Sequence, residues 1–147
     1  MACRNPELCA KKHKRWKKYQ SIFIPIGEEE HNIFIQNFEK GNAQLSLKSY
    51  LDQDRPHADL RTFQRAISKR DLIDVVLNGW VIERNYFPDE QVIRLVILGY
   101  TRRYRPLHVV CEIVNELDWE IVTVYSPLSK KHKWGNEYQE RVCFCKD

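Results

Sequence analysis

The sequence predicts an α+β protein in which two helices pack on a mainly antiparallel sheet of four strands. In residues 55–147 two helical patterns precede four strand candidates, without the strand–helix alternation that a parallel sheet needs. Hydrophobic residues make up 43% of the 147 residues and charged residues 30%, which is typical of a folded chain. We expect three parts: a basic segment at 1–20, a β-rich extension at 21–54 and an α+β domain at 55–147.

The positive charge of the chain is concentrated at its N-terminus. The formal net charge is +4, but residues 1–20 contain seven Lys and Arg against Glu7 alone. Such a block is often only a solvated surface, and it also suits an arm that binds phosphates. The candidate nucleic-acid-binding residues are Lys11, Lys12, Lys14, Arg15, Trp16, Lys17 and Lys18. Among them Trp16, with Tyr19 close behind, offers a ring that can stack on a base.

The extension at 21–54 alternates apolar and polar residues in three stretches. These stretches are 21–26, 31–37 and 43–49, and each reads as a short strand. Pro25 restricts the first one to an edge or a bulge, because proline cannot donate to a ladder. The turn signal Lys40-Gly41-Asn42 precedes the third. A small β meander is therefore expected here.

Two helices and four strands are expected after Pro56. The first helix runs from about His57 to Ala66, and proline suits its entrance because no N–H is needed there. Ser68 and Asp71 form a capping box for a second helix, which stops at Asn78-Gly79. The strand candidates are 80–86, 91–100, 106–114 and 120–125, separated by polar turns.

Three basic side chains share one flank of the expected first helix. His57, Arg61 and Arg65 are spaced i, i+4, i+8, which places them in a stripe beside the apolar one. An imidazole can move a proton near neutral pH, and guanidinium groups match phosphate oxygens. The stripe is thus a candidate phosphodiester site, and a solvated basic face is the alternative.

A family resemblance adds to this interpretation. The residues that carry it are His57-x₃-Arg61-x₃-Arg65-Ala-Ile-Ser68, Leu77-x-Gly79, Ile82-Glu83, Leu98-Gly99, Leu107-His-Val-Val110, Ile121-Val-Thr-Val-Tyr125, Trp134 and Arg141. This string, from about His57 to Arg141, resembles a family of uncharacterised small domains. That family is similar to the RelE-like toxins, which are grouped with the barnase, EndoU and colicin-tRNase nucleases. Nothing in residues 1–50 matches the pattern.

The resemblance implies a metal-independent endoribonuclease that needs no cofactor, acting as a toxin or in RNA processing. The ribose 2′-hydroxyl would attack its own phosphorus, which requires a base, an acid and cations. The implied catalytic residues are His57, Arg61, Arg65, Thr123, Tyr125, Arg141 and His108. His57 would transfer a proton and the arginines would hold the phosphate. Thr123 and Tyr125 share one strand face and would bond the phosphate, or Tyr125 would act as an acid.

Two readings remain open beside the nuclease. The first is an inert RNA-binding or protein-interaction module on the same fold, since function depends on the site. The second is that residues 20–50 bind a partner chain through an exposed strand edge, as an antitoxin-like contact would require. His108 is open as well, because a strand histidine is more often packed and hydrogen-bonded than catalytic.

The remaining signals are weak. Five cysteines, at positions 3, 9, 111, 143 and 145, do not suggest a disulfide framework. The spacings C-x₅-C and C-x-C are not typical of zinc, so we predict free thiols and no metal. Zinc stays an alternative if the two ends of the chain meet, with His13 as a further ligand. No apolar run suits a membrane span or a signal peptide, and a cytoplasmic location is expected.

Overall fold

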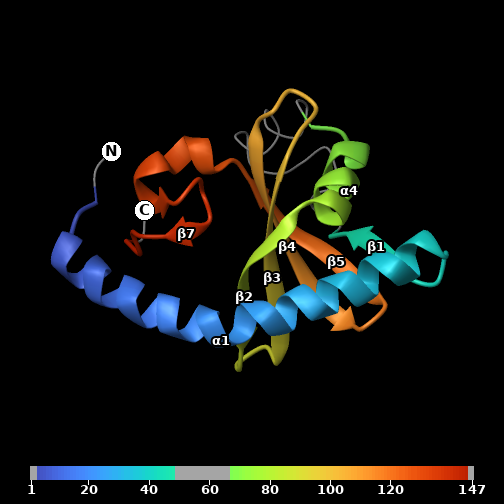
Figure 1. The fold of residues 1–147 in the computed structure, drawn as a ribbon, viewed down its shortest axis with the longest axis horizontal. Helices are drawn as coiled ribbons and strands as arrows, with labels where there is room; N and C mark the ends of the chain where they lie inside the picture. The colour runs from blue at the N-terminus through green and yellow to red at the C-terminus, as the bar shows by residue number, and fades with distance from the viewer. Residues whose placement is uncertain (1–2, 49–66, 146–147) are drawn as a thin grey trace.

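The computed structural model describes residues 3–48 and 67–145, and within them a long helix precedes one large sheet (Figure 1). The helices are α1 (Pro6–Glu39), α4 (Lys69–Asn78) and the 3₁₀ helix η1 (Pro127–Lys133). The strands of the large sheet are β1 (Gln44–Leu47), β2 (Trp80–Phe87), β3 (Val92–Tyr100), β4 (Pro106–Asn115) and β5 (Asp118–Tyr125). A short hairpin, β6 (Trp134–Gly135) with β7 (Glu140–Arg141), ends the chain.

The large sheet has the order β1-β5-β4-β3-β2. Strands β2 to β5 form the antiparallel meander that the sequence predicts, and the α+β class is confirmed. The sheet has one more strand than expected, because β1 pairs in parallel with β5. The register shifts at Val81/Glu83 in β2 and opposite Val110/Cys111, where β5 has the extra residue Val122, are bulges that turn neighbouring side chains onto the other face.

The predicted β-rich extension is wrong for most of its length, because residues 6–39 form a single helix of 34 residues. Its buried residues include Gln20, Gly27, His31 and Phe34, a spacing that follows the helical repeat. Pro25 lies inside the helix and is exposed. Because proline has no N–H, one carbonyl of the preceding turn lacks its helical hydrogen bond. The alternating apolar residues that suggested strands lie partly on this buried face. Of the three expected strands only the third exists, as β1.

The second expected helix is present as α4. Ser68 accepts a hydrogen bond from the N–H of Asp71 at 3.0 Å, and the Asp71 carboxylate accepts from the N–H of Ser68 at 3.2 Å. The predicted capping box is therefore confirmed. The first expected helix, from about His57 to Ala66, lies outside the described residues.

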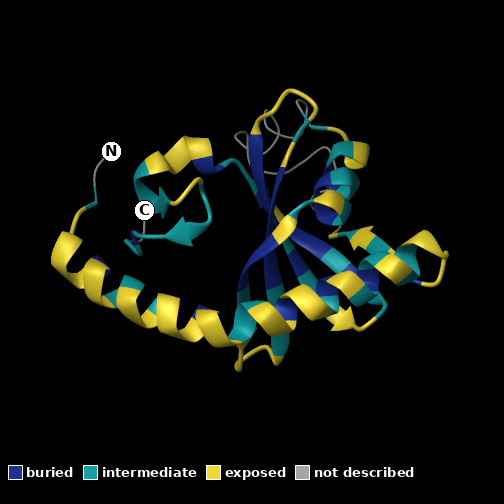
Figure 2. Cartoon of the chain, in the orientation of Figure 1, coloured by how far each residue is buried: buried dark blue, intermediate teal, exposed yellow. Residues whose placement is uncertain are grey.

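The hydrophobic core lies between one face of the sheet and the helices α1 and α4 (Figure 2). The ring of Phe34 in α1 stacks on Trp119 of β5 at 4.2 Å between centroids. His31 beside it has a lowered pKa because it is buried, so its neutral Nε2–H donates to the carbonyl of Val76 at 2.6 Å. A side chain at Gly27 would lie 3.1 Å from Leu95, so glycine permits the close approach of α1 to the sheet.

The N-terminal half of α1 extends beyond the sheet toward the C-terminal segment (Figure 1). On the way it crosses the edge strand β2, where Gln20 bonds the side chain of Asn85 at 2.8 Å and the N–H of Arg84 at 2.9 Å. Arg84 in turn pairs with Glu30 at 2.7 Å. These contacts fix the helix to the sheet. The 3₁₀ helix η1 and the β6–β7 hairpin lie between the first turns of α1 and the second face of the sheet, which is the face opposite the core.

Candidate functional site

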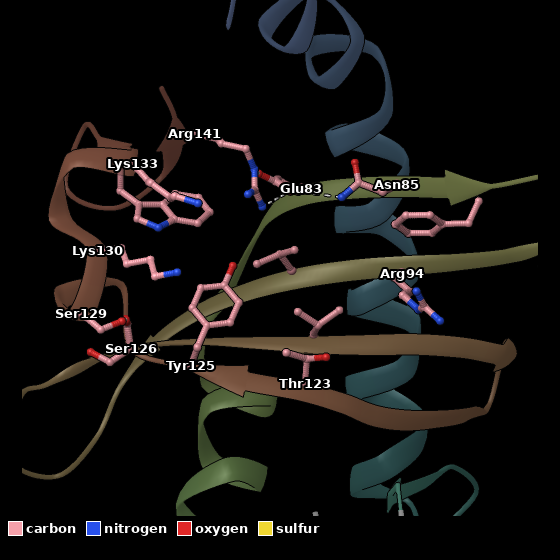
Figure 3. Close-up of a pocket in the computed structure, with 14 residues that line it drawn as sticks. Glu83, Asn85, Arg94, Thr123, Tyr125, Ser126, Ser129, Lys130, Lys133 and Arg141 are labelled. Atoms are coloured by element: carbon pink, nitrogen blue, oxygen red, sulfur yellow. Dashed lines mark hydrogen bonds and ion pairs between the residues drawn. The ribbon is translucent and has the colours of Figure 1, made fainter. Parts of the chain in front are cut away.

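A polar pocket of about 400 Å³ lies on the second face of the sheet, opposite α4 and beneath the C-terminal segment. Figure 3 shows its floor, formed by side chains of β2, β3 and β5, and its wall, formed by η1 and the hairpin. The bulges in β2 and β5 aim polar side chains at this face. The lining residues with polar side chains are Glu83, Asn85, Arg94, Thr123, Tyr125, Ser126, Ser129, Lys130, Lys133 and Arg141.

Glu83 is the centre of the hydrogen bonds at this site. Its side chain is 2% exposed and accepts from four donors on three elements. Arg141 of β7 donates from Nε at 3.0 Å and from its terminal nitrogen at 3.2 Å. Trp16 of α1 donates its indole N–H at 3.1 Å, and Asn85 its amide at 3.1 Å. This carboxylate therefore joins the first helix, the sheet edge and the hairpin.

Tyr125 and Thr123 lie on the same face of β5 and line the pocket together with Arg141. Burial raises the pKa of Tyr125 to about 12, an effect that the neighbouring Arg141 guanidinium opposes. The phenol is thus a neutral hydroxyl near pH 7, able to donate a hydrogen bond or a proton. Arg141 also lies over the ring of Trp134, 4.7 Å from its centroid, which fixes the orientation of the guanidinium.

Further cations surround the pocket. Lys130 and Lys133 come from η1, and Lys133 donates to the carbonyl of Cys145 at 2.8 Å. Arg94 comes from β3 and pairs with Glu90 and Glu112. Lys130 and Lys133 therefore bring ammonium groups to the rim of the pocket. A group with negative charge and several acceptor oxygens would complement it.

His108 lies behind the pocket and does not line it. Its side chain is fully buried, with Tyr125 and Trp134 in edge contact at 5.2 Å and 4.3 Å between centroids. Burial lowers the pKa of His108 to about 4, so the ring is neutral and its Nε2 donates to the carbonyl of Tyr138 at 2.9 Å. The geometry therefore favours the packed, hydrogen-bonded reading, in which His108 positions Tyr125 and the hairpin.

A second hollow adjoins the pocket along the N-terminal half of α1. It shares Glu83, Asn85, Phe87, Lys133 and Arg141 with the pocket. Its aromatic lining is Trp16, Tyr19, Tyr86, Phe87 and Phe144. Beside it, the basic residues of α1 are mostly exposed, and Lys17 lies 3.9 Å from Glu140. Among the predicted nucleic-acid-binding residues, Trp16 is thus the one that lines this hollow. Its indole N–H is occupied by Glu83.

The predicted site residues are brought together in part. Thr123, Tyr125 and Arg141, which are distant in sequence, line one pocket. His57, Arg61 and Arg65 lie outside the described residues, so their predicted role stays a prediction. Sequence reasoning missed Glu83, Asn85, Lys130 and Lys133 as pocket residues. The alternation Glu83-x-Asn85 within an apolar strand was the available signal, since it puts two polar groups on one face.

All five cysteines are free thiols, as predicted, and four of them cluster in the way that the zinc alternative requires. Cys3, Cys9, Cys143 and Cys145 place their sulfur atoms within 4.8 Å of one another, so the ends of the chain do meet. His13 does not join them, because its ring pairs with Glu140 at 3.3 Å. Cys111, the fifth cysteine, is buried in the main core.

Comparison with known families matches about half of the chain. Residues 55–126 match the model of a domain of unknown function (DUF4258). The DUF4258 range contains α4 and β2 to β5, and thus the floor of the pocket, while α1, η1 and the hairpin lie outside it. The match to this family assigns no activity and gives no link to the RelE-like nucleases. No curated protein and no solved structure matches the chain.

Membrane insertion through a helix finds no support in the described residues. Among them, none of the helices combines the length and the apolar character needed to cross a bilayer.

Proposed function

We propose that this protein binds single-stranded RNA along α1 and cleaves it in the pocket between β5 and the C-terminal hairpin. The observation that supports this most is the continuity of the two hollows, one aromatic and beside basic residues, the other polar with cations at its rim. Aromatic rings stack on unpaired bases, and lysine and arginine side chains follow the phosphate backbone. The pocket then receives one phosphodiester.

The chemistry proposed is transfer of the phosphoryl group within the RNA. The ribose 2′-oxygen forms a bond to phosphorus as the bond to the 5′-oxygen breaks, giving a 2′,3′-cyclic phosphate and a 5′-hydroxyl. Tyr125 gives its proton to the leaving 5′-oxygen, and its neutral state near pH 7 suits that role. Arg141 and Lys133 stabilise the charge that develops on the phosphoryl oxygens. His57 remains the proposed base, as the family resemblance implies.

The rival proposal is an RNA-binding module without catalysis. It is favoured by the pairing of Arg141 with Glu83, because an arginine that is already bonded twice has fewer donors for phosphate. Both proposals predict binding of single-stranded RNA, and only the first predicts cleavage. A toxin role with an antitoxin-like partner would apply to the first proposal.

The test is Tyr125→Phe, which removes only the hydroxyl. The single-turnover rate of cleavage of an end-labelled RNA in EDTA should fall roughly 10²- to 10⁴-fold, the rate factor that a general acid usually contributes. The affinity for the RNA should stay nearly unchanged. Tyr104→Phe is the matched control, since Tyr104 is 87% exposed and lines neither hollow. Wild-type cleavage by Tyr125→Phe would refute the assignment of the acid. Binding without cleavage by the wild-type protein would establish the module.

A further inference from the structure

Four thiols from the two ends of the chain converge beside the first turn of α1. The pairs Cys3–Cys145 and Cys9–Cys145 lie 3.8 Å and 3.6 Å apart between sulfur atoms, and Cys9–Cys143 lies 4.0 Å apart. Cys9 and Cys143 are buried, while Cys3 and Cys145 are partly exposed. In residues 3–48 and 67–145, these are the thiols that cluster, because Cys111 lies in the core instead.

We propose that these four cysteines bind a single structural zinc ion as thiolates. Four sulfur atoms at about 2.3 Å from a central zinc form a tetrahedron with edges of about 3.8 Å. The three sulfur–sulfur separations of 3.6, 3.8 and 4.0 Å match these edges. A multi-iron cluster would hold its cysteine sulfurs farther apart than 4.8 Å, the upper bound observed here. The geometry therefore points to one tetrahedral ion with all four positions filled by protein.

The surroundings of the sulfurs suit thiolates. The N–H of Phe144 donates to the sulfur of Cys9 at 3.2 Å. Cys9 lies in the first turn of α1, where the helix dipole is positive and lowers the energy of nearby negative charge. The ammonium of Lys133 bonds the carbonyl of Cys145 at 2.8 Å, which brings a cation to the same segment. A zinc ion with four thiolates carries a net charge of −2, and these groups partly offset it.

The metal would clamp the long helix to the C-terminal hairpin. Apart from the cysteines, the N-terminal half of α1 meets the rest of the protein through few side-chain contacts, such as Trp16–Glu83 and His13–Glu140. A short chain segment with little apolar contact gains order from a metal ion, because binding free energy becomes folding free energy. The clamp also fixes Lys133 and Arg141, which form the wall of the pocket. This inference does not rest on the proposed function.

The sequence offered zinc at these cysteines only as an alternative, because the ligand pairs have unusual spacings. Zinc sites generally show C-x₂₋₄-C pairs, whereas here Cys3 and Cys9 are separated by five residues and Cys143 and Cys145 by one. The two pairs are also far apart in the sequence, since Cys143 lies 134 positions after Cys9. Only the tertiary structure brings the two pairs together.

The test is metal analysis of the full-length protein purified under reducing conditions from zinc-supplemented medium. We expect one zinc per chain, released by a mercurial reagent and detected with a chromogenic chelator. Cys9→Ser should lose the zinc, and Cys111→Ala, the matched control in the fifth cysteine, should keep it. Should Cys9→Ser fail to fold, cobalt added to the chelated wild-type protein gives an independent readout. It should produce the ligand-field and sulfur-to-metal charge-transfer bands of tetrahedral thiolate cobalt.

Three results would overturn the proposal. The first is wild-type protein without zinc that also fails to give the tetrahedral cobalt spectrum. The second is an intact mass, measured without reductant on freshly purified protein, that shows disulfides among these cysteines. The third is iron in place of zinc at one ion or more per chain, which would contradict the choice of metal.

Discussion

Replacing Glu83 by alanine should destabilise the protein more than removal of any surface acid. The carboxylate is buried and accepts hydrogen bonds from Arg141, Trp16 and Asn85, so its loss leaves the four donor groups of these three residues without their acceptor. Breaking a buried ion pair from one side costs roughly 3–5 kcal/mol. The side chain of Arg141 is 29% exposed, so water can hydrate part of it once Glu83 is removed. We therefore expect a loss at the low end of this range, about 3 kcal/mol of unfolding free energy. A chain of this size should lose roughly 6–12 °C in Tm.

Urea denaturation followed by far-ultraviolet circular dichroism measures this loss. Glu90→Ala is the control: its carboxylate bonds Arg94 at 2.7 Å but is 58% exposed, and Arg94 keeps Glu112. An exposed pair of this kind contributes about 0.2–1 kcal/mol. If Glu83→Ala lost no more free energy of unfolding than Glu90→Ala, Glu83 would not be the centre that joins α1, β2 and the hairpin.

Two further predictions concern pH and salt. The folded-state pKa of His108 is lowered to about 4 by burial, so its stabilising contribution is complete above about pH 6.5 and is lost toward pH 4. The total loss is roughly 3 kcal/mol, and His108→Leu should flatten that part of the urea-derived stability curve; an unchanged curve would contradict the assignment. Neutralising the exposed Lys11, Lys14 and Lys18 to Gln should lower the log–log salt slope of single-stranded RNA binding by about 2 units. Lys69→Gln on α4 is the control, and equal slopes would show that α1 does not contact phosphate.

The elements with strong local signals could be predicted from the sequence. The capping box at Ser68 and Asp71 defines the start of α4, because a side chain and a backbone N–H three residues apart satisfy each other. The meander β2 to β5 follows from period-two alternation and polar turns, which act over short distances. Thr123 and Tyr125 could be placed on one face for the same reason. These predictions need only the residue and its near neighbours.

The N-terminal third could not be predicted, because its local pattern fits both states. The stretch around Ile22 to Ile26 alternates like a strand and contains Pro25, yet it is helical. Tertiary contacts decide between strand and helix here. Gly27 lets the helix approach Leu95, and Phe34 gains a stacked contact with Trp119 across the core. Burial of this kind contributes more than the roughly 1 kcal/mol spread of local β preferences.

The sequence by itself determined the class of the fold, the antiparallel meander and the basic character of the first helix. Only the tertiary structure decided that Arg141 reaches Glu83 and Tyr125, and that four cysteines at opposite ends of the chain converge. The physical reason is the separation along the sequence between the residues that interact. Hydrogen bonds within a turn or a strand pair are encoded by spacing, whereas contacts across more than fifty residues depend on how the elements pack, which no local pattern records.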